Sequence, residues 1–463
     1  MLTYQDLLQA QAESRLLAFL TTAMQAHESS PEKHIAQIGS DYMRQQNTTI
    51  TNYRKIIYDI NGQAKLDTYS ANYQCASNFY KTNITQLVHY LLGNGVSFDK
   101  PDTKDKLGGE AFDTLLVRIV TDALAEGSSS AYFNNGKIYE FRVREYYAFP
   151  DEETGAYRAG IRYWQLAPDK PLRLTLYLEN GYIEFIRRKG EELRLMDGFE
   201  LDRPKPYIEI VSQSPRDAEL NIDAVTIGQN YNGFPIVPCY GNYNKQAEIV
   251  GKRQHIDCYD LIESGFANNV DEASYIYWIL NNACGMDDVD LAEFKRKMMS
   301  LHVAKTNDET SISAHTVDMP TEARETLLNR LERDIYTDAM ALNIHDISAG
   351  SVTATAIRAA STPLDQRADE LETCVIDFIQ GLLALIGVED TPHFRRFRLT
   401  NQEEETAMVL SAAQYLDTRT LLEKLPWLTP EEVDVVMDRR ADEDIDRYEP
   451  ATEEDEEDVE DVG

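Results

Sequence analysis

The sequence lacks the features of several large protein classes. Its 463 residues contain no run of about 18 apolar residues, so we expect no segment to cross a membrane. The N-terminal stretch has no basic region followed by a cleavage site, so we expect no signal peptide. The five cysteines are dispersed and form no CxxC pair. This usage favours reduced thiols in a cytosol over a disulfide scaffold or a zinc site.

The motifs of common enzyme classes are also missing. The eight histidines form no HExxH motif and no pair at metal-ligand spacing, and there is no GxSxG, Walker or kinase signature. His345 and Asp346 lie beside Ser348 and Ser351, but the members of a nucleophile set are usually brought together by the fold and not by the sequence. We therefore predict no catalytic residues, no cofactor and no metal site.

Positive charge is scarce. The 45 Lys and Arg face 79 Asp and Glu, which gives a formal net charge of −34. Residues 442–463 alone carry 13 acidic groups against Arg447, and we expect this tail to be disordered and solvated. The remaining chain, at −22, is still acidic. That balance argues against a protein that wraps nucleic acid by neutralising phosphates, although a protein that only lets DNA pass needs no basic surface.

The pattern of apolar residues predicts an α+β protein. Helical periodicity covers seven stretches: 3–27, 32–46, 70–92, 110–126, 245–270, 321–344 and 352–386. Residues 130–240 are instead short, aromatic and β-branched, with hairpin signals at Asn135-Gly136 and Asn180-Gly181, so we predict an antiparallel β region. The stretch 402–440 reads as small helices, with capped starts at Asp417 or Thr418 and at Thr429-Pro430.

The last long helical pattern carries a proline. At about 1.5 Å per residue the stretch 352–386 would extend roughly 50 Å. Pro363 lies inside it and should kink the helix, because its ring removes a backbone donor and clashes one turn back. A long kinked helix exceeds what one small core can cover, which suggests an element shared between domains or subunits.

A loop of mostly small residues, HDISAGS at 345–351, separates two helical patterns. A phosphate-binding loop would need a lysine after its last glycine, whereas Gly350 is followed by Ser351, Val352 and Thr353. A simple interhelix turn remains possible. Further on, HFRRFRLT at 393–400 alternates aromatic and basic residues, so it is either a strand with one basic face or a nucleic-acid contact.

Five motifs, taken in order, resemble the portal proteins of tailed bacteriophages, in the family found in siphophages of Gram-positive hosts. They are YLLGNGVSF (90–98), NGFPIVPCYGN (232–242), HIDCYDLIESGFANNVDE (255–272), SAGSVTATAIRAASTPLDQRADELE (348–372) and LDTRTLLEKLPWL (416–428). The resemblance implies a dodecameric ring at one capsid vertex. Double-stranded DNA would be packaged through its channel by terminase and later ejected.

The resemblance also implies a division of the chain. It comprises a wing of N-terminal helices and an antiparallel β region (1–244), a first stem helix (245–270), a small α/β clip (271–320), a second stem helix (321–344), a tunnel loop (345–351), a long kinked wing helix with a following strand (352–399), a helical crown (400–441) and the acidic tail (442–463). The family often shows Ser-Gly before the long helix, where this chain has Ala349-Gly350-Ser351.

Candidate site residues follow from that division. The tunnel loop would be His345, Asp346, Ile347, Ser348, Ala349, Gly350 and Ser351, at the narrowest part of the channel. Small side chains can pack against ring neighbours, and a loop with few cations would not trap phosphates as DNA slides. Channel-lining candidates on the polar face of the second stem helix are Arg324, Asn329, Arg330 and Arg333.

The resemblance implies several partners and a location. Clip residues Lys295, Arg296 and Lys297 are candidates for contact with the terminase large subunit or the head-completion adaptor, although a solvated helix face explains them equally well. Major capsid and scaffolding proteins are further implied partners, and no membrane is. The protein would be assembled in the host bacterial cytoplasm and would reside in the virion.

Two other functions stay open at this stage. A metal-dependent DNA-processing enzyme, such as a nuclease, would need clustered carboxylates, and the only dense set in the β region is Asp151, Glu152 and Glu153. These residues precede Thr154-Gly155 and read as a hairpin loop. A capsid scaffolding protein would be more helical and would lack the long aromatic β region.

Overall fold

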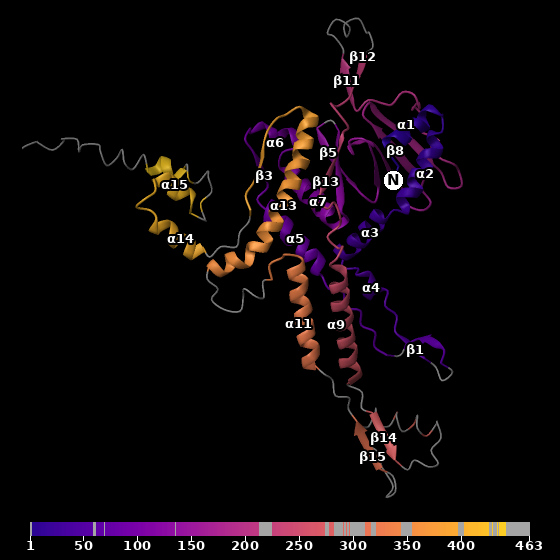
Figure 1. The fold of residues 1–463 in the computed structure, drawn as a ribbon, viewed down its shortest axis with the longest axis vertical. Coiled ribbons are helices and arrows are strands. Elements are labelled where there is room, and N and C mark those ends of the chain that lie inside the picture. The colour runs from indigo at the N-terminus through magenta and orange to yellow at the C-terminus, as the bar shows by residue number, and fades with distance from the viewer. Residues whose placement is uncertain are drawn as a thin grey trace, which may run out of the picture. The chain divides into compact units, whose positions relative to one another are not determined.

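A computed structural model describes most of the chain. The described residues are 2–58, 62–68, 70–134, 136–212, 225–273, 277–281, 290, 293, 296, 311–315, 321–343, 354–396, 402–425, 428, 433 and 435–440. The chain divides into two units (Figure 1), the first of Met1–Asn343 with Pro363–Phe397 and the second of Ile344–Thr362 with Arg398–Gly463. Within the described ranges no helix is both long and apolar enough to cross a membrane.

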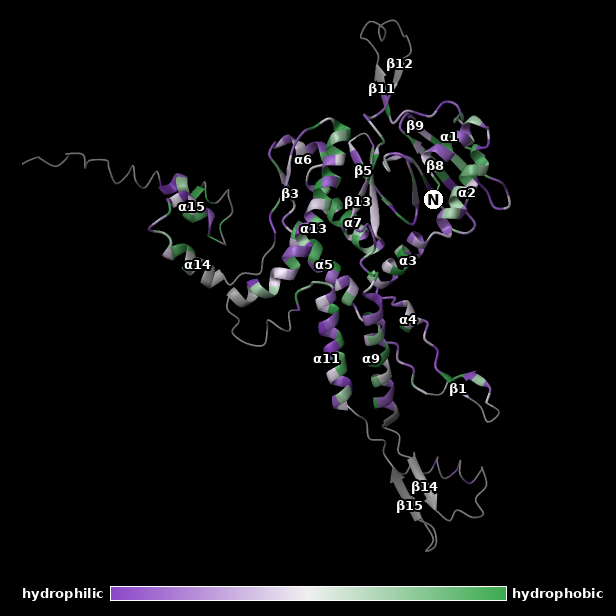
Figure 2. Cartoon of the chain, viewed as in Figure 1, coloured by the Kyte–Doolittle hydropathy of each residue, from purple (hydrophilic) through white to green (hydrophobic). Residues whose placement is uncertain are grey.

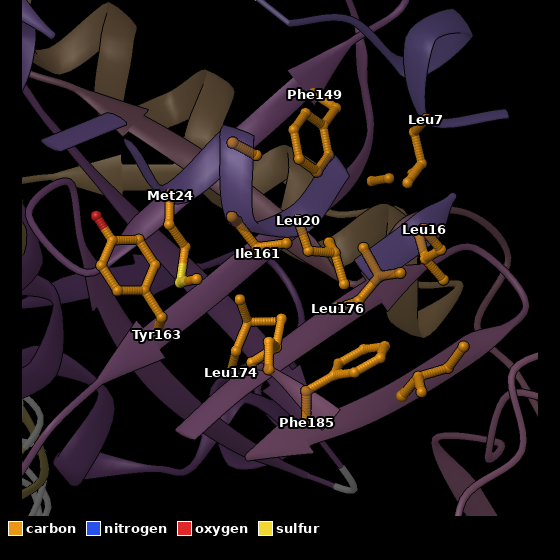
Figure 3. Packing of buried hydrophobic residues seen from close by; sticks show 14 of the residues in the cluster. Leu7, Leu16, Leu20, Met24, Phe149, Ile161, Tyr163, Leu174, Leu176 and Phe185 are labelled. Carbon is orange, nitrogen blue, oxygen red and sulfur yellow. The ribbon is translucent and has the colours of Figure 1, made fainter. Parts of the chain in front are cut away.

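Two N-terminal helices cover a five-stranded antiparallel sheet. The helices are α1 (Tyr4–Ala12) and α2 (Leu16–Glu28). The sheet has the order β10-β9-β8-β7-β6, with bounds Arg194–Leu195, Gly181–Arg187, Leu172–Leu178, Tyr157–Trp164 and Tyr146–Pro150. Leu7, Leu20, Phe149, Ile161 and Phe185 are fully or almost fully buried between helices and sheet (Figure 3). Each such side chain contributes about 1.5–3 kcal/mol of burial free energy.

The single helix predicted over residues 3–27 is wrong. Thr3 caps α1 by accepting from the Asp6 N–H, and the chain breaks at Ser14, which has a left-handed φ of 55°. The break lets α1 and α2 each lay an apolar face on the same sheet, through Leu7 and Leu20. Tertiary packing therefore overrides a continuous helical pattern.

A second, three-stranded sheet has the order β13-β4-β5, with bounds Ile236–Tyr240, Ser128–Asn134 and Lys137–Arg142. It packs with α7 (Glu110–Glu126), next to α3 (Pro31–Met43) and α5 (Phe79–Leu92). Aromatic side chains join it to the five-stranded sheet: the Tyr132 and Tyr177 rings lie 5.0 Å apart. The predicted antiparallel β region is confirmed, and so is the hairpin at Asn180-Gly181, which joins β8 to β9.

Short strands tie distant segments together. α5 ends at Leu92, Gly95 takes a φ of 73°, and β3 (Val96–Phe98) follows. A Cβ on Gly95 would lie 2.6 Å from Asp113 Oδ2, so glycine is needed there for space as well as for its backbone angle. β3 pairs with β16 (Pro392–Phe394), which includes only the first two residues of the HFRRFRLT stretch, so the strand is shorter than expected over 393–396, and residues 397–400 lie outside the described residues.

The following Arg396 has a structural role. Its guanidinium contacts three carboxylates on α13 (Ala354–Ile386), those of Asp365, Asp369 and Glu372, the last at 2.5 Å. Burial lowers the pKa of Arg396, but the hydrogen bonds with Glu372 and Asp369 outweigh burial and raise it. Arg396 is therefore committed to ion pairs within the chain, whereas Arg395 is exposed and Arg398 lies outside the described residues.

The long helix α13 is nearly as predicted. Its apolar stripe, which includes Leu364, Leu371 and Phe378, is buried. A Cβ on Gly381 would lie 2.7 Å from the Val237 side chain, so the helix packs closely on β13. Pro363 lies within the helix but at the boundary between the two units, so the predicted kink stays a prediction.

The described part of the second unit contains α14 (Gln402–Ser411) and α15 (Thr418–Glu423). Asp417 caps α15, since its side chain accepts from the Thr420 N–H at 3.0 Å, which confirms that helix start. Residues 429–430, where another start was predicted, and the acidic tail lie outside the described residues.

Candidate functional site

Two helices form the candidate stem. They are α9 (Arg253–Ala273) and α11 (Thr321–Asp338). His255 Nδ1 lies 2.8 Å from Asp338 Oδ2, so the start of α9 meets the end of α11. The Arg324 guanidinium, near the start of α11, lies 5.8 Å from the Phe266 ring of α9. The two helices are therefore antiparallel, as Figure 1 also shows.

One aromatic side chain, that of Phe79, contacts both α9 and α11. Phe79, at the start of α5, has its ring 4.9 Å from that of Tyr259 on α9 and 5.9 Å from that of Tyr336 on α11, both in edge-to-face geometry. Such pairs contribute about 0.5–1.5 kcal/mol beyond burial. Leu331 and Ile335 of α11 are buried beside them. These contacts fix the start of α5 to both α9 and α11.

The face of α9 opposite to α11 contacts an extended segment, residues 71–78, which we call the strap. Backbone N–H groups of the strap donate to side chains of α9: Tyr73 to Asn268 (2.7 Å), Cys75 to Ser264 (2.9 Å) and Ser77 to Asp260 (2.9 Å). Two residues of extended chain span about 6.6 Å, and four residues of helix span about 6 Å. The spacing of alternate strap residues therefore matches that of every fourth residue of α9. One row of polar side chains on α9 thus accepts hydrogen bonds from the N–H groups of alternate strap residues.

The strap corrects a prediction. Helix was expected over 70–92, but α5 begins only at Phe79. The backbone donors of the strap are taken by Asn268, Ser264 and Asp260, none of which a local pattern reveals. Burial raises the pKa of Asp260 although Asn47 and Ser77 donate to it. This polar row is therefore a buried structural feature of the stem.

The far end of α11 is held by a buried ion cluster. Arg367 of α13 donates to the Ala339 carbonyl (2.5 Å) and to Glu248 Oε2 (2.9 Å), and Lys252 also pairs with Glu248. Only 9% of the Arg367 surface is exposed. Burial raises the pKa of the Glu248 carboxyl, but the charges of Arg367 and Lys252 outweigh it, so the pKa is lowered. We call Arg367, Glu248 and Lys252 the clamp.

A second contact holds the chain just after the end of α11. Gln86 of α5 donates to the Leu342 carbonyl and accepts from the Leu342 N–H, both at 2.9 Å. The predicted tunnel loop starts at His345. The clamp and Gln86 therefore fix the chain at Ala339 and Leu342, immediately before that loop.

The four channel-lining candidates fall into two groups. Arg324 faces α9, where both its Nη atoms lie 2.6 Å from the Asn269 amide oxygen once that amide is oriented to accept. Asn329, Arg330 and Arg333 are exposed, and at 100° per residue they lie on the side of α11 turned away from Arg324. Figure 2 colours α11 mainly as hydrophilic. Only these three are free of the α9 interface, and Arg330 also pairs with Asp334 at 3.7 Å.

Other predicted site residues lie outside the described residues. They include the whole tunnel loop, His345 to Ser351, and clip residues Lys295 and Lys297. Arg296 is helical and exposed, and the range predicted as the clip also contains the antiparallel pair β14 (Tyr277–Asn281) and β15 (Ser311–His315). The helix predicted to start at residue 245 starts only at Arg253, because residues 248–252 form turns in which the Glu248 N–H donates to the Leu124 carbonyl at 2.9 Å.

The rival nuclease site has a structural explanation. Asp151 closes the loop between β6 and β7: its carboxylate accepts from the Thr154 N–H (3.0 Å) and from the Gln5 amide (2.9 Å). Glu152 accepts from the Thr3 hydroxyl at 2.8 Å. The loop interpretation is thus confirmed. Among the residues that the structure describes, no group of three or more His, Cys, Asp or Glu is placed to hold a metal ion.

The sequence reasoning missed the clamp. Arg367 lies three residues after Leu364 and four before Leu371, so a charged residue occupies the apolar stripe of α13. That interruption was the available signal. Its partner Glu248 lies far away in the sequence, on a turn within the stretch 245–270 that was predicted to be helical.

Comparisons with known proteins identify the family. Residues 34–458 match the family described as "Phage portal protein, SPP1 Gp6-like". A portal protein of Clostridium phage phiCD119 is 26% identical over 217 residues, which cover 45% of this chain and 48% of the relative. The portal protein of Bacillus phage SPP1 is 20% identical over 337 residues, covering 69% and 63%. The match thus spans about half to two-thirds of the length of these relatives.

Solved structures match over about three-quarters of the chain at low identity. The neck of an empty gene transfer agent (GTA) particle computed with C6 symmetry matches with a TM-score of 0.44 and 10% identity over 74% of this chain and 88% of that chain. The neck of a native GTA particle computed with C12 symmetry matches with a TM-score of 0.43 and 10% identity, over 76% and 90%. Because the family match covers residues 34–458 of the 463, this chain belongs to the SPP1 Gp6-like family of phage portal proteins.

Proposed function

We propose that this chain forms a closed ring of twelve subunits at one vertex of a phage capsid. Double-stranded DNA enters through its channel during packaging and leaves through it at ejection. The observation that carries the proposal is the family match over residues 34–458, which includes both stem helices, the loop and the crown. The paired, antiparallel helices α9 and α11, anchored to the wing by Phe79, are the rigid element that such a channel needs.

The channel in this proposal is lined by one face of α11 and by the tunnel loop. Asn329, Arg330 and Arg333 are the favoured lining residues because they are exposed and turned away from α9. A few arginines in an acidic protein give weak, short-lived phosphate contacts, which suits DNA that must slide. The loop from His345 to Ser351 narrows the channel, and the clamp holds its start.

The partners in this proposal dock on different parts. The clip, with Arg296 exposed on its helix, contacts the terminase large subunit during packaging and the head-completion adaptor afterwards. Major capsid and scaffolding proteins surround the wing and crown. The ring assembles in the host cytoplasm and remains in the virion. The chain has no catalytic role of its own, since the motor chemistry belongs to terminase.

Native mass spectrometry of the purified chain tests this function. We expect a closed oligomer of about a dozen subunits, because ring contacts between like subunits follow from the family architecture. Negative-stain images should show a central hole. Monomers or dimers at every salt concentration, together with metal-dependent DNA cleavage that is lost on changing Asp151, Glu152 and Glu153, would contradict the proposal and favour the nuclease.

A further inference from the structure

One two-stranded element of the wing is left without a core. It is the pair β1 (Ile56–Tyr58) and β2 (Ala64–Leu66), which we call the arm. All six strand residues are exposed in the single chain. The strands pair antiparallel with each other, and the sheet that they form has no third strand in the described part of the chain. An isolated pair of strands is marginally stable in water, so the arm needs a surface to rest on.

One face of the arm is apolar throughout. Ile56 pairs with Leu66 and Tyr58 with Ala64, so these four side chains lie on the same side of the two strands. Their exposure is large: 56% for Ile56, 74% for Tyr58 and 56% for Leu66. Tyr53, at the base, adds a further 42% exposed aromatic side chain. Figure 2 colours part of β1 as hydrophobic at this exposed position.

Hydrogen bonds hold the base of the arm, although its strands are exposed to solvent. The Asp67 N–H donates to the Lys55 carbonyl at 2.9 Å, and the Gln74 amide donates to the Tyr53 carbonyl at 2.7 Å. Gln74 belongs to the strap, which lies along α9. The contacts of α9 with the strap and with α11 are on opposite sides of the helix, so the arm leaves the stem on the side away from α11 (Figure 1).

Charge indicates what covers the arm. Residues 53–67, which include both sides of the base, contain Arg54, Lys55 and Lys65 against Asp59 and Asp67, a net charge of +1 within a chain of −34. A basic, apolar element on an acidic protein is complementary to the surface of another copy of the same protein. DNA is a poorer match, because it offers charge but little apolar surface to cover Ile56, Tyr58 and Leu66.

We infer that the arm packs on the neighbouring copy of this chain and contributes to the stability of the ring. This inference rests on the proposed ring. In a cyclic assembly each subunit gives one face and receives the other, so one arm from every subunit can be covered by the next without a free end. The apolar face supplies the contact area, and the net positive charge of the arm supplies attraction to an acidic receiving surface.

The test compares ring stability in three variants with the full-length parent chain. The first changes the apolar face, Ile56→Ser, Tyr58→Ser and Leu66→Ser together. The second reverses charge, Arg54→Glu with Lys65→Glu. The control is Leu166→Ser, which changes another apolar side chain, 87% exposed, in the loop between β7 and β8. Native mass spectrometry over a dilution series measures the concentration at which each ring dissociates, and circular dichroism checks that each chain is folded.

We expect the ring of the apolar-face variant to dissociate at a protein concentration at least tenfold above that of the parent. The ring of the charge variant should dissociate at low salt as readily as the parent ring does at high salt. The control should behave as the parent does. If the parent forms rings and both arm variants form rings of equal stability, the inference is wrong and the arm serves another capsid component. If the parent forms no ring at all, the proposed function fails first.

Discussion

Arg367→Met is expected to lower the free energy of unfolding by about 3 kcal/mol. Methionine fills much of the space but leaves the Glu248 carboxylate, 10% exposed, without its arginine. Breaking a buried ion pair from one side typically costs about 3–5 kcal/mol, and Lys252, which also contacts Glu248, keeps the expected loss at the lower end. The Ala339 carbonyl also loses its donor, so the end of α11 should loosen as well.

Urea unfolding of the purified chain measures this effect. Arg358→Met is the matched control, because Arg358 is an exposed arginine on the same helix and its loss should change stability by less than about 0.5 kcal/mol. The double variant Arg367→Met with Glu248→Gln removes the stranded charge and should recover part of the loss. Equal stability of Arg367→Met and the control would show that the clamp does not hold the end of α11.

His27 should make the wing sensitive to mild acid. Its ring is 2% exposed, stacks on Tyr147 at 5.1 Å between ring centres, and has Nδ1 2.7 Å from the Tyr163 hydroxyl. Burial, aided by the charge of Lys33, lowers the pKa of His27 to about 4. The unfolded chain therefore binds a proton near pH 6.5, whereas the folded chain does not. Stability is full above about pH 6.5 and is lost as the pH falls toward 4.

The expected loss is about 2 kcal/mol between pH 7 and pH 5. Glu140 acts in the opposite direction, since burial and the neighbouring Asp122 raise its pKa to about 7. The measurement is therefore the difference between the parent and His27→Gln at each pH, by urea unfolding. His34→Gln, at an exposed site on α3, is the control. A parent and a His27→Gln variant with the same pH dependence would contradict the assignment.

Local patterns predicted the elements whose faces are apolar along their own length. The helix expected at 110–126 is α7, and the stretch 352–386 is α13 from Ala354 to Ile386. In both, the buried stripe recurs every three or four residues, so a single sequence is enough to find it. The antiparallel β region was found for the same reason, from short alternating segments between turn residues.

The error at the strap occurred where distant residues decide the local structure. The strap is extended because Asp260, Ser264 and Asn268 take its backbone donors, and nothing near residue 75 in the sequence indicates this. The arm was not predicted at all, although Ile56–Tyr58 and Ala64–Leu66 flank an Asn61-Gly62 pair, a hairpin signal. The stem assignment stays a prediction from the family resemblance, whereas the clamp was seen only in the structure.

Single-particle cryo-electron microscopy of the purified ring would show which residues line its channel. We predict a closed ring whose channel is wide enough for a DNA duplex and is lined by the exposed face of α11, with Asn329, Arg330 and Arg333, and by residues 345–351. The apolar contacts of α11 with α9 should be unchanged from the single chain. A ring whose channel is lined by the five-stranded sheet, or an assembly with no open channel, would contradict it.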